Sequence, residues 1–133
     1  MKRNISMYSN ISKFILQSKT TELKTSYYPK EYLDFDVKFS FGMGTPAKIT
    51  WAGIFNTDIR NTKGITCTYL YYKETNILFL VYGIREANVG GETWPEEVSE
   101  NNPSINEYFD QHSYGKPYRY GDSFVFKAYI PKM

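Results

Sequence analysis

The chain has 133 residues, of which 41% are hydrophobic and 18% are aromatic, and its formal net charge is only +2. This length suffices for a single domain, residues 1–133, with its own core, and the lone cysteine, Cys67, excludes an internal disulfide framework. No apolar run approaches the roughly 20 residues that cross a bilayer, and the N-terminus lacks the apolar stretch of a signal peptide. We therefore expect a cytoplasmic protein that does not contact a membrane.

The first half of the chain predicts one helix and several strands. Residues 5–18 carry apolar side chains at helical spacing and predict an amphipathic helix. Residues 36–41 alternate apolar and polar side chains, the period of a strand with one buried face, and residues 48–55 predict a second strand. Residues 65–72 and 77–84 flank a short turn and predict a hairpin. The strand at 77–84 is apolar enough to be covered on both faces.

The second half adds a loop, a short helix and a final strand. Residues 86–103 form a long loop rich in acidic residues, glycine and proline. The Ser-Ile-Asn-Glu sequence at 104–107 resembles a capping box and predicts the start of a short helix. Residues 123–130 alternate as a last strand. The order of elements predicts an α+β domain with a curved, mainly antiparallel sheet of about five strands, an N-terminal amphipathic helix and a short helix before the last strand.

Charge is distributed unevenly along the chain. Residues 86–111 contain seven acidic residues and no lysine or arginine, so the rest of the chain is basic. Such an excess can form a surface that faces nucleic-acid phosphates, if the cations share one side. Ordinary solvated charge is the other interpretation, and composition alone leaves both open.

The loop between the first two predicted strands has an unusual sequence. Gly42 and Gly44 free the backbone on both sides of Met43. A loop of this kind can push an apolar side chain outward, toward a partner and away from the protein's own core. This feature favours a recognition device over a catalytic one.

Enzymatic sites are poorly supported by the pattern. Residues 42–47 fit the dinucleotide motif G-x-G-x-x-A, but a strand and no helix is expected to follow. Asp36 and Lys38, with Asp34 nearby, resemble part of a metal-dependent nuclease site, yet alternation places them on one solvent-facing side of a strand. His112 is the only histidine and has no zinc-ligand partner nearby. We expect a binding domain with no catalytic residues and no metal.

Aromatic and cationic residues recur together in the sequence. Trp51 has Lys48 nearby, tyrosines are dense at 69–72, and Tyr118 and Tyr120 stand in a late loop that also contains two cations, Lys116 and Arg119. Aromatic faces beside cations suit a protein that stacks a base and holds its phosphates. Core and rim packing is the alternative explanation for the same side chains.

Several segments in order carry a family resemblance: 37–44 (Val-Lys-Phe-Ser-Phe-Gly-Met-Gly), 49–51 (Ile-Thr-Trp), 64–65, 70–73 (Leu-Tyr-Tyr-Lys), 81–84 (Val-Tyr-Gly-Ile), 94, 107–109 (Glu-Tyr-Phe) and 120–121. Through them the whole chain resembles the N-terminal DNA-binding domains of the McrB family, the recognition and GTPase subunits of modification-dependent restriction systems. The resemblance implies a module that binds DNA bearing a methylated cytosine and rotates that base out of the duplex.

The resemblance also implies roles for individual residues. Trp51 and Tyr120 would be the aromatic walls of the base pocket, and Leu70 an apolar wall near the methyl group. Met43, hinged by Gly42 and Gly44, would be the wedge that enters the vacated stack. The best-known form of the family has tyrosine at the wedge position, whereas methionine supplies apolar bulk without a ring or hydroxyl.

Further expectations concern phosphates and partners. Possible phosphate contacts are Lys38, Lys48, Lys63, Lys116 and Arg119. The partner would be double-stranded DNA with a modified cytosine and, through a full-length protein, a McrC-like nuclease subunit active in phage defence. No cofactor is expected in this domain, while a missing AAA+ motor would use GTP and Mg²⁺.

Three alternatives stay open at this point. The domain could flip another modified base, such as methyladenine, or it could bind single-stranded nucleic acid or RNA without flipping. A metal-dependent nuclease using Asp34, Asp36 and Lys38 is the least favoured.

Overall fold

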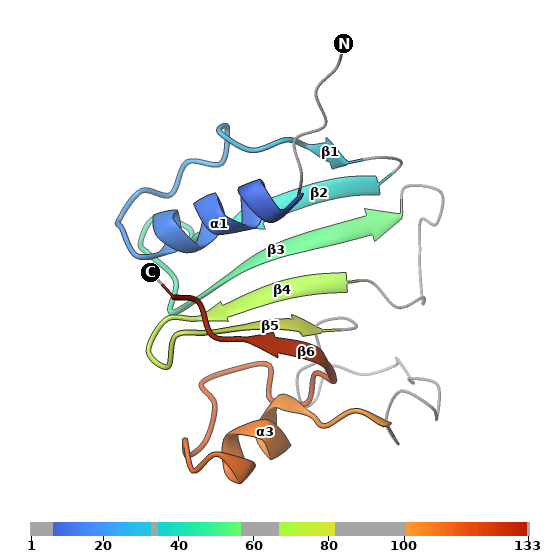
Figure 1. Ribbon diagram of the computed structural model, residues 1–133. Helices are drawn as coiled ribbons and strands as arrows, with labels where there is room; N and C mark the ends of the chain where they lie inside the picture. The colour runs from blue at the N-terminus through green and yellow to red at the C-terminus, as the bar shows by residue number, and fades with distance from the viewer. Residues whose placement is uncertain (1–6, 33–34, 57–66, 82–100, 133) are drawn as a thin grey trace.

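The computed structural model describes residues 7–32, 35–56, 67–81 and 101–132 (Figure 1). Within these ranges, six strands form one antiparallel sheet in the order β1-β2-β3-β4-β5-β6. The elements are α1 (Met7–Ser18), β1 (Glu31–Tyr32), β2 (Phe35–Ser40), β3 (Ile49–Asn56), β4 (Cys67–Tyr72), β5 (Ile77–Val81), α3 (Ile105–Gln111) and β6 (Val125–Tyr129). The expected α+β fold on an antiparallel sheet is confirmed.

Two details differ from the sequence-based prediction. The sheet has six strands where about five were expected, because β1 adds a two-residue edge strand through Glu31↔Asp36 and Tyr32↔Phe35. Two residues are too few to produce a recognisable alternation. The last strand begins at Val125, not at 123. Ser123 makes its backbone hydrogen bonds elsewhere: its N–H donates to the Tyr120 carbonyl and its carbonyl accepts from the Ile105 N–H.

Some predicted ranges extend outside the described residues. This holds for the start of the first helix, the start of β4, the end of β5 and most of the acidic loop at 86–103. The longest described helix, α1, has 12 residues. No helix in the described part of the chain is long and apolar enough to span a membrane.

Each face of the sheet has its own apolar core. On one face, α1 packs with Phe14 against Phe39 and Tyr71. On the other face, α3 packs against residues that include Leu70 and Phe79. Neighbouring strand residues thus serve opposite cores, as strand alternation requires. Since β5 contributes to both cores, the prediction that it is covered on both faces is confirmed.

Local sequence signals explain how α3 begins and how β2 joins β3. Ser104 Oγ accepts from the Glu107 N–H at 3.1 Å, and Glu107 Oε1 accepts from the Ser104 N–H at 2.8 Å, so the capping box is confirmed. The β2–β3 loop is closed by a 2.9 Å hydrogen bond from the Ala47 N–H to the Phe41 carbonyl. It leads into β3 and not into a helix, which removes the dinucleotide-binding interpretation.

Candidate nucleic-acid interface

The β2–β3 loop presents Met43 to solvent. Its side chain is 94% exposed, more than any other large apolar side chain described. Gly42 and Gly44 have φ angles of +124° and +78°, a region that favours glycine. A Cβ at Gly42 would also collide with the Thr45 carbonyl oxygen, whereas one at Gly44 would meet open space. The loop therefore points an apolar side chain into solvent. Its backbone conformation at position 42 accepts only glycine.

Trp51 and Leu70 are direct neighbours across the sheet. The register pairs Ser40 with Trp51, Trp51 with Leu70 and Leu70 with Phe79, so one row of side chains crosses the face that α3 covers. Trp51 is half-buried at the margin of this core, and Leu70 is fully buried. Tyr120 joins the same core with 9% exposure. The structure thus places the three residues predicted to form a base pocket in one apolar core.

Tyr120 is held in an unusual backbone conformation. Its φ of +64° lies in the left-handed region, which costs a bulky residue roughly 1–2 kcal/mol. The peptides around it are anchored from two sides: Tyr72 donates its hydroxyl hydrogen to the Arg119 carbonyl, and the Asn106 N–H donates to the Gly121 carbonyl at 2.9 Å. Arg119 places its guanidinium carbon 4.6 Å from the centroid of the Tyr120 ring. β4 and α3 therefore anchor the peptides on both sides of Tyr120, and Arg119 contacts its ring.

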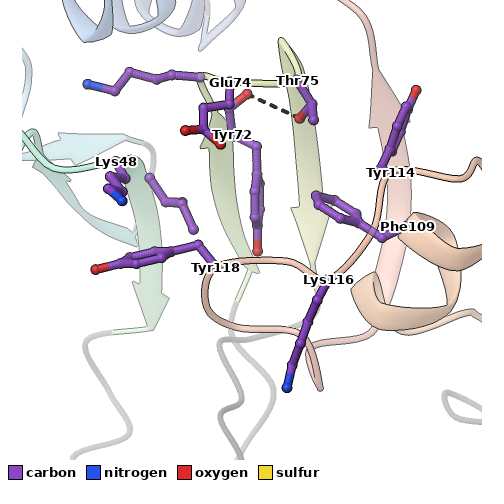
Figure 2. A pocket seen from close by; sticks show the side chains of 10 residues that line it. Lys48, Tyr72, Glu74, Thr75, Phe109, Tyr114, Lys116 and Tyr118 are labelled. Atoms are coloured by element: carbon purple, nitrogen blue, oxygen red, sulfur yellow. Dashed lines mark hydrogen bonds between the residues drawn. The ribbon is translucent and has the colours of Figure 1, made fainter.

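A cation–π contact joins the β2–β3 loop to the loop that carries Tyr120. Lys48 Nζ lies 4.6 Å from the centroid of the Tyr118 ring, and Figure 2 shows the two side chains next to each other. Tyr118 is 64% exposed. Met43 and Tyr120 therefore belong to two loops that meet at one end of the sheet, although more than 70 residues separate them in the sequence.

A cleft opens at this meeting point, between the start of β3, the β4–β5 turn and the loop after α3. Its volume is about 260 Å³. Ile49, Tyr72 and Phe109 are buried residues in its wall, and Tyr118 lines the exposed side. In Figure 2 the Tyr72 ring lies between Tyr118 and Phe109. Lysines come from all three segments: Lys48, Lys73 and Lys116. The sequence did not single out Lys73, because no local pattern places this turn residue beside the other two.

A second aromatic group stands beside α3. Tyr108 stacks on His112 with ring centroids 4.1 Å apart, and His112 Nδ1 lies 2.9 Å from the Tyr108 carbonyl. Burial, and to a smaller degree the neighbouring Tyr114, raises the pKa of Tyr108, so this phenol stays neutral. His112 therefore caps the end of α3 in a packed arrangement. Among the described residues no three histidine, cysteine or acidic side chains gather as metal ligands.

The remaining predicted residues lie elsewhere. Lys38 and Asp36 are exposed on β2, on the side of the strand opposite Val37, as a solvent-facing strand side requires. Lys38 shares the sheet face of Trp51 but does not line the cleft. Lys63, predicted as a phosphate contact, and Asp34, the proposed second carboxylate, are outside the described residues.

Comparison with known proteins identifies a relative of this chain. No protein-family model matches the chain. The chain is 35% identical over 116 residues to the type IV methyl-directed restriction enzyme EcoKMcrB subunit of Escherichia coli (strain K12). The match covers 86% of this chain and 25% of that relative. The chain therefore spans about a quarter of the length of the protein it matches.

Proposed function

This chain is a member of the McrB family, and on that premise we propose that it is a DNA-binding domain that recognises a modified cytosine by flipping it out of the duplex. Trp51 and Tyr120 are the aromatic walls that receive the base, and Leu70 lies at the bottom of the pocket. Met43 is the wedge that fills the vacated position in the stack. The observation that carries the proposal is a 94% exposed apolar side chain on the loop whose Lys48 contacts Tyr118, in the same loop as Tyr120.

The geometry supports the division of roles between wedge and pocket. Unstacking a base costs a few kcal/mol. A protein that flips a base must offset this cost by stacking the base in its pocket and by filling the vacated position in the duplex. Met43 is almost fully exposed, so insertion into DNA would cost it little contact with its own protein. Trp51 is half-buried, so part of this residue stays accessible. Because Leu70 is fully buried, an incoming base reaches it only when neighbouring side chains move aside.

The contribution of the methyl group is limited by its size. Burial of one methyl against Leu70 is worth about 0.8–1 kcal/mol, or roughly fivefold in affinity. Stronger discrimination requires a further difference, such as easier flipping of the modified base or steric rejection of another base. We therefore propose a pocket that tolerates several cytosine modifications.

The domain acts within a longer protein under this proposal. The relative is named as a subunit of a methyl-directed restriction enzyme, and the chain matches only a quarter of it. We propose that the rest of the corresponding protein carries an AAA+ GTPase motor that recruits a McrC-like nuclease subunit. The isolated domain then binds DNA and neither cleaves it nor hydrolyses GTP.

A binding series at fixed salt tests the proposal. Duplexes that differ at one position should be compared: cytosine, 5-methylcytosine, 5-hydroxymethylcytosine, 4-methylcytosine and 6-methyladenine. We expect a modified cytosine duplex to bind best. Equal affinity for all duplexes refutes modified-base recognition, and tighter binding to an unmodified single strand favours a sequence-tolerant binder instead.

Substitutions then locate the pocket. Trp51→Ala and Tyr120→Ala should each weaken the preferred duplex by about 1–3 kcal/mol, the scale of one lost base–aromatic stack. Met43→Ala should weaken it while leaving the melting temperature unchanged, because exposed substitutions alter stability by less than about 0.5 kcal/mol. Folded variants at Trp51 and Tyr120 that retain full affinity place the pocket elsewhere.

A further inference from the structure

The cleft beside the wedge loop is distinct from the proposed base pocket. It is lined by residues of three segments that converge only in the fold: Lys48 before β3, Lys73 and Glu74 in the β4–β5 turn, and Lys116 and Tyr118 after α3. Trp51, Leu70 and Tyr120 do not line it. The two sites share a wall, because the Tyr72 side chain lines the cleft while its hydroxyl bonds to the Arg119 carbonyl next to Tyr120.

The lining of the cleft carries more positive than negative side chains, which favours binding of an anion. Three lysines line it and Glu74 is the only carboxylate among its lining residues. An ammonium on a flexible stem binds phosphate oxygens as a point charge and can reorient toward them. Figure 2 shows Lys116 at the rim, with its ammonium directed away from Tyr72. Lys48 is already placed over Tyr118 at the opening. The exposed Tyr118 ring adds a flat apolar surface of the kind that packs against a sugar or base.

We propose that this cleft binds a phosphodiester of the DNA strand next to the flipped nucleotide, with Lys73 as a phosphate contact. The proposal deepens the function given above and rests on it for the identity of the ligand. The cleft lies between the β2–β3 loop and the loop that carries Tyr120, so it can hold a backbone phosphate beside the target nucleotide in plain and modified duplexes alike. Phosphate contacts of this type set position and affinity but carry no sequence information.

The sign of each charge makes the proposal testable. Lys73→Gln should lower affinity for plain and modified duplexes by the same factor. It should also make the negative slope of log K against log salt shallower by about 0.9. This is the change expected when one phosphate contact, and the counterion release that goes with it, is lost. Glu74→Gln removes the repelling carboxylate from the same turn, so it should tighten binding to both duplexes. A general folding defect weakens binding and cannot produce this gain.

The matched control is Lys132→Gln, which also removes one exposed lysine. Lys132 lies on the other face of the sheet, beside Ile11 and Ile15 of α1, and its substitution should leave the slope unchanged. Fluorescence anisotropy with a labelled plain duplex of about 20 base pairs, between roughly 50 and 200 mM salt, measures all four proteins in the range where phosphate contacts dominate.

The outcomes separate this inference from the proposed function. A slope for Lys73→Gln equal to that of Lys132→Gln overturns the phosphate site, and so does a failure of Glu74→Gln to tighten binding. Modified-base recognition is judged by the ratio of affinities for modified and plain duplexes, which these substitutions should not change. A wild-type ratio of one with the expected slope change would refute base recognition and support the phosphate site.

Discussion

The hydroxyl of Tyr72 offers the sharpest test of how the proposed base pocket is held. Tyr72 is 4% exposed and donates to the Arg119 carbonyl, 47 residues away in sequence. This bond anchors the peptide just before Tyr120, whose left-handed backbone costs roughly 1–2 kcal/mol. Tyr72→Phe deletes the bond and preserves the ring. We predict that the turn then relaxes for part of the time into conformations that misplace the Tyr120 ring.

The size of the effect follows from one hydrogen bond. Its net worth is about 1 kcal/mol, so the variant should melt about 3–5 °C lower for a domain of this length. If the whole of that energy shifts the equilibrium of the turn away from the conformation that presents Tyr120, the binding-competent population falls up to about fivefold. The apparent Kd for the modified duplex then rises by the same factor. Plain duplex held by phosphate contacts should be affected little, so the ratio of the two affinities falls.

A neighbouring tyrosine provides the matched control. Tyr71 is 1% exposed and donates its hydroxyl hydrogen to Asn76 Oδ1 at 2.6 Å, on the face that α1 covers. Tyr71→Phe should lower the melting temperature by a similar amount and leave the affinity ratio intact. Thermal unfolding and anisotropy with plain and 5-methylcytosine duplexes measure both quantities. If Tyr72→Phe lowers the melting temperature but keeps the wild-type ratio, the bond has no role in presenting Tyr120.

Two further predictions concern stability. Gly42→Ala should destabilise the protein by more than about 2 kcal/mol, because its positive φ is compounded by the collision with Thr45. Gly44→Ala, where a Cβ would meet open space, should cost only about 1–2 kcal/mol. Equal losses of unfolding free energy in chemical denaturation would contradict the crowding at Gly42. Burial raises the pKa of Tyr28 to about 12 from an ordinary value of 10.0. The neutral phenol is therefore favoured in the folded state, and its contribution of up to about 2–3 kcal/mol is present below pH 10 and lost as pH rises toward 12. Tyr28→Phe should flatten this loss in denaturant unfolding at pH 8 and 11, and an unchanged pH dependence would show that Tyr28 is not responsible.

The local structural features of this protein could be predicted from its sequence. Alternation along 36–41 identifies β2, the Ser104–Glu107 pattern identifies the start of α3, and the Gly-Met-Gly segment identifies an outward-facing side chain. Each depends on residues within a few positions of one another, where period and backbone dihedrals decide the outcome. The edge strand β1 has no such signature, because two residues gain their structure from the partner strand and not from a pattern of their own.

The arrangement of the site was decided by contacts between distant segments. No local rule states that Trp51 pairs with Leu70, that Lys48 lies over Tyr118, or that a turn lysine at position 73 shares their cleft. Strand register, the approach of the late loop to β4 and the packing of α3 place them there. The sequence by itself indicated the family resemblance, the types of residue and the exposed side chain of Met43. Tertiary structure alone decided which aromatic rings and which cations meet, because side-chain convergence depends on how strands pair and pack across the whole chain.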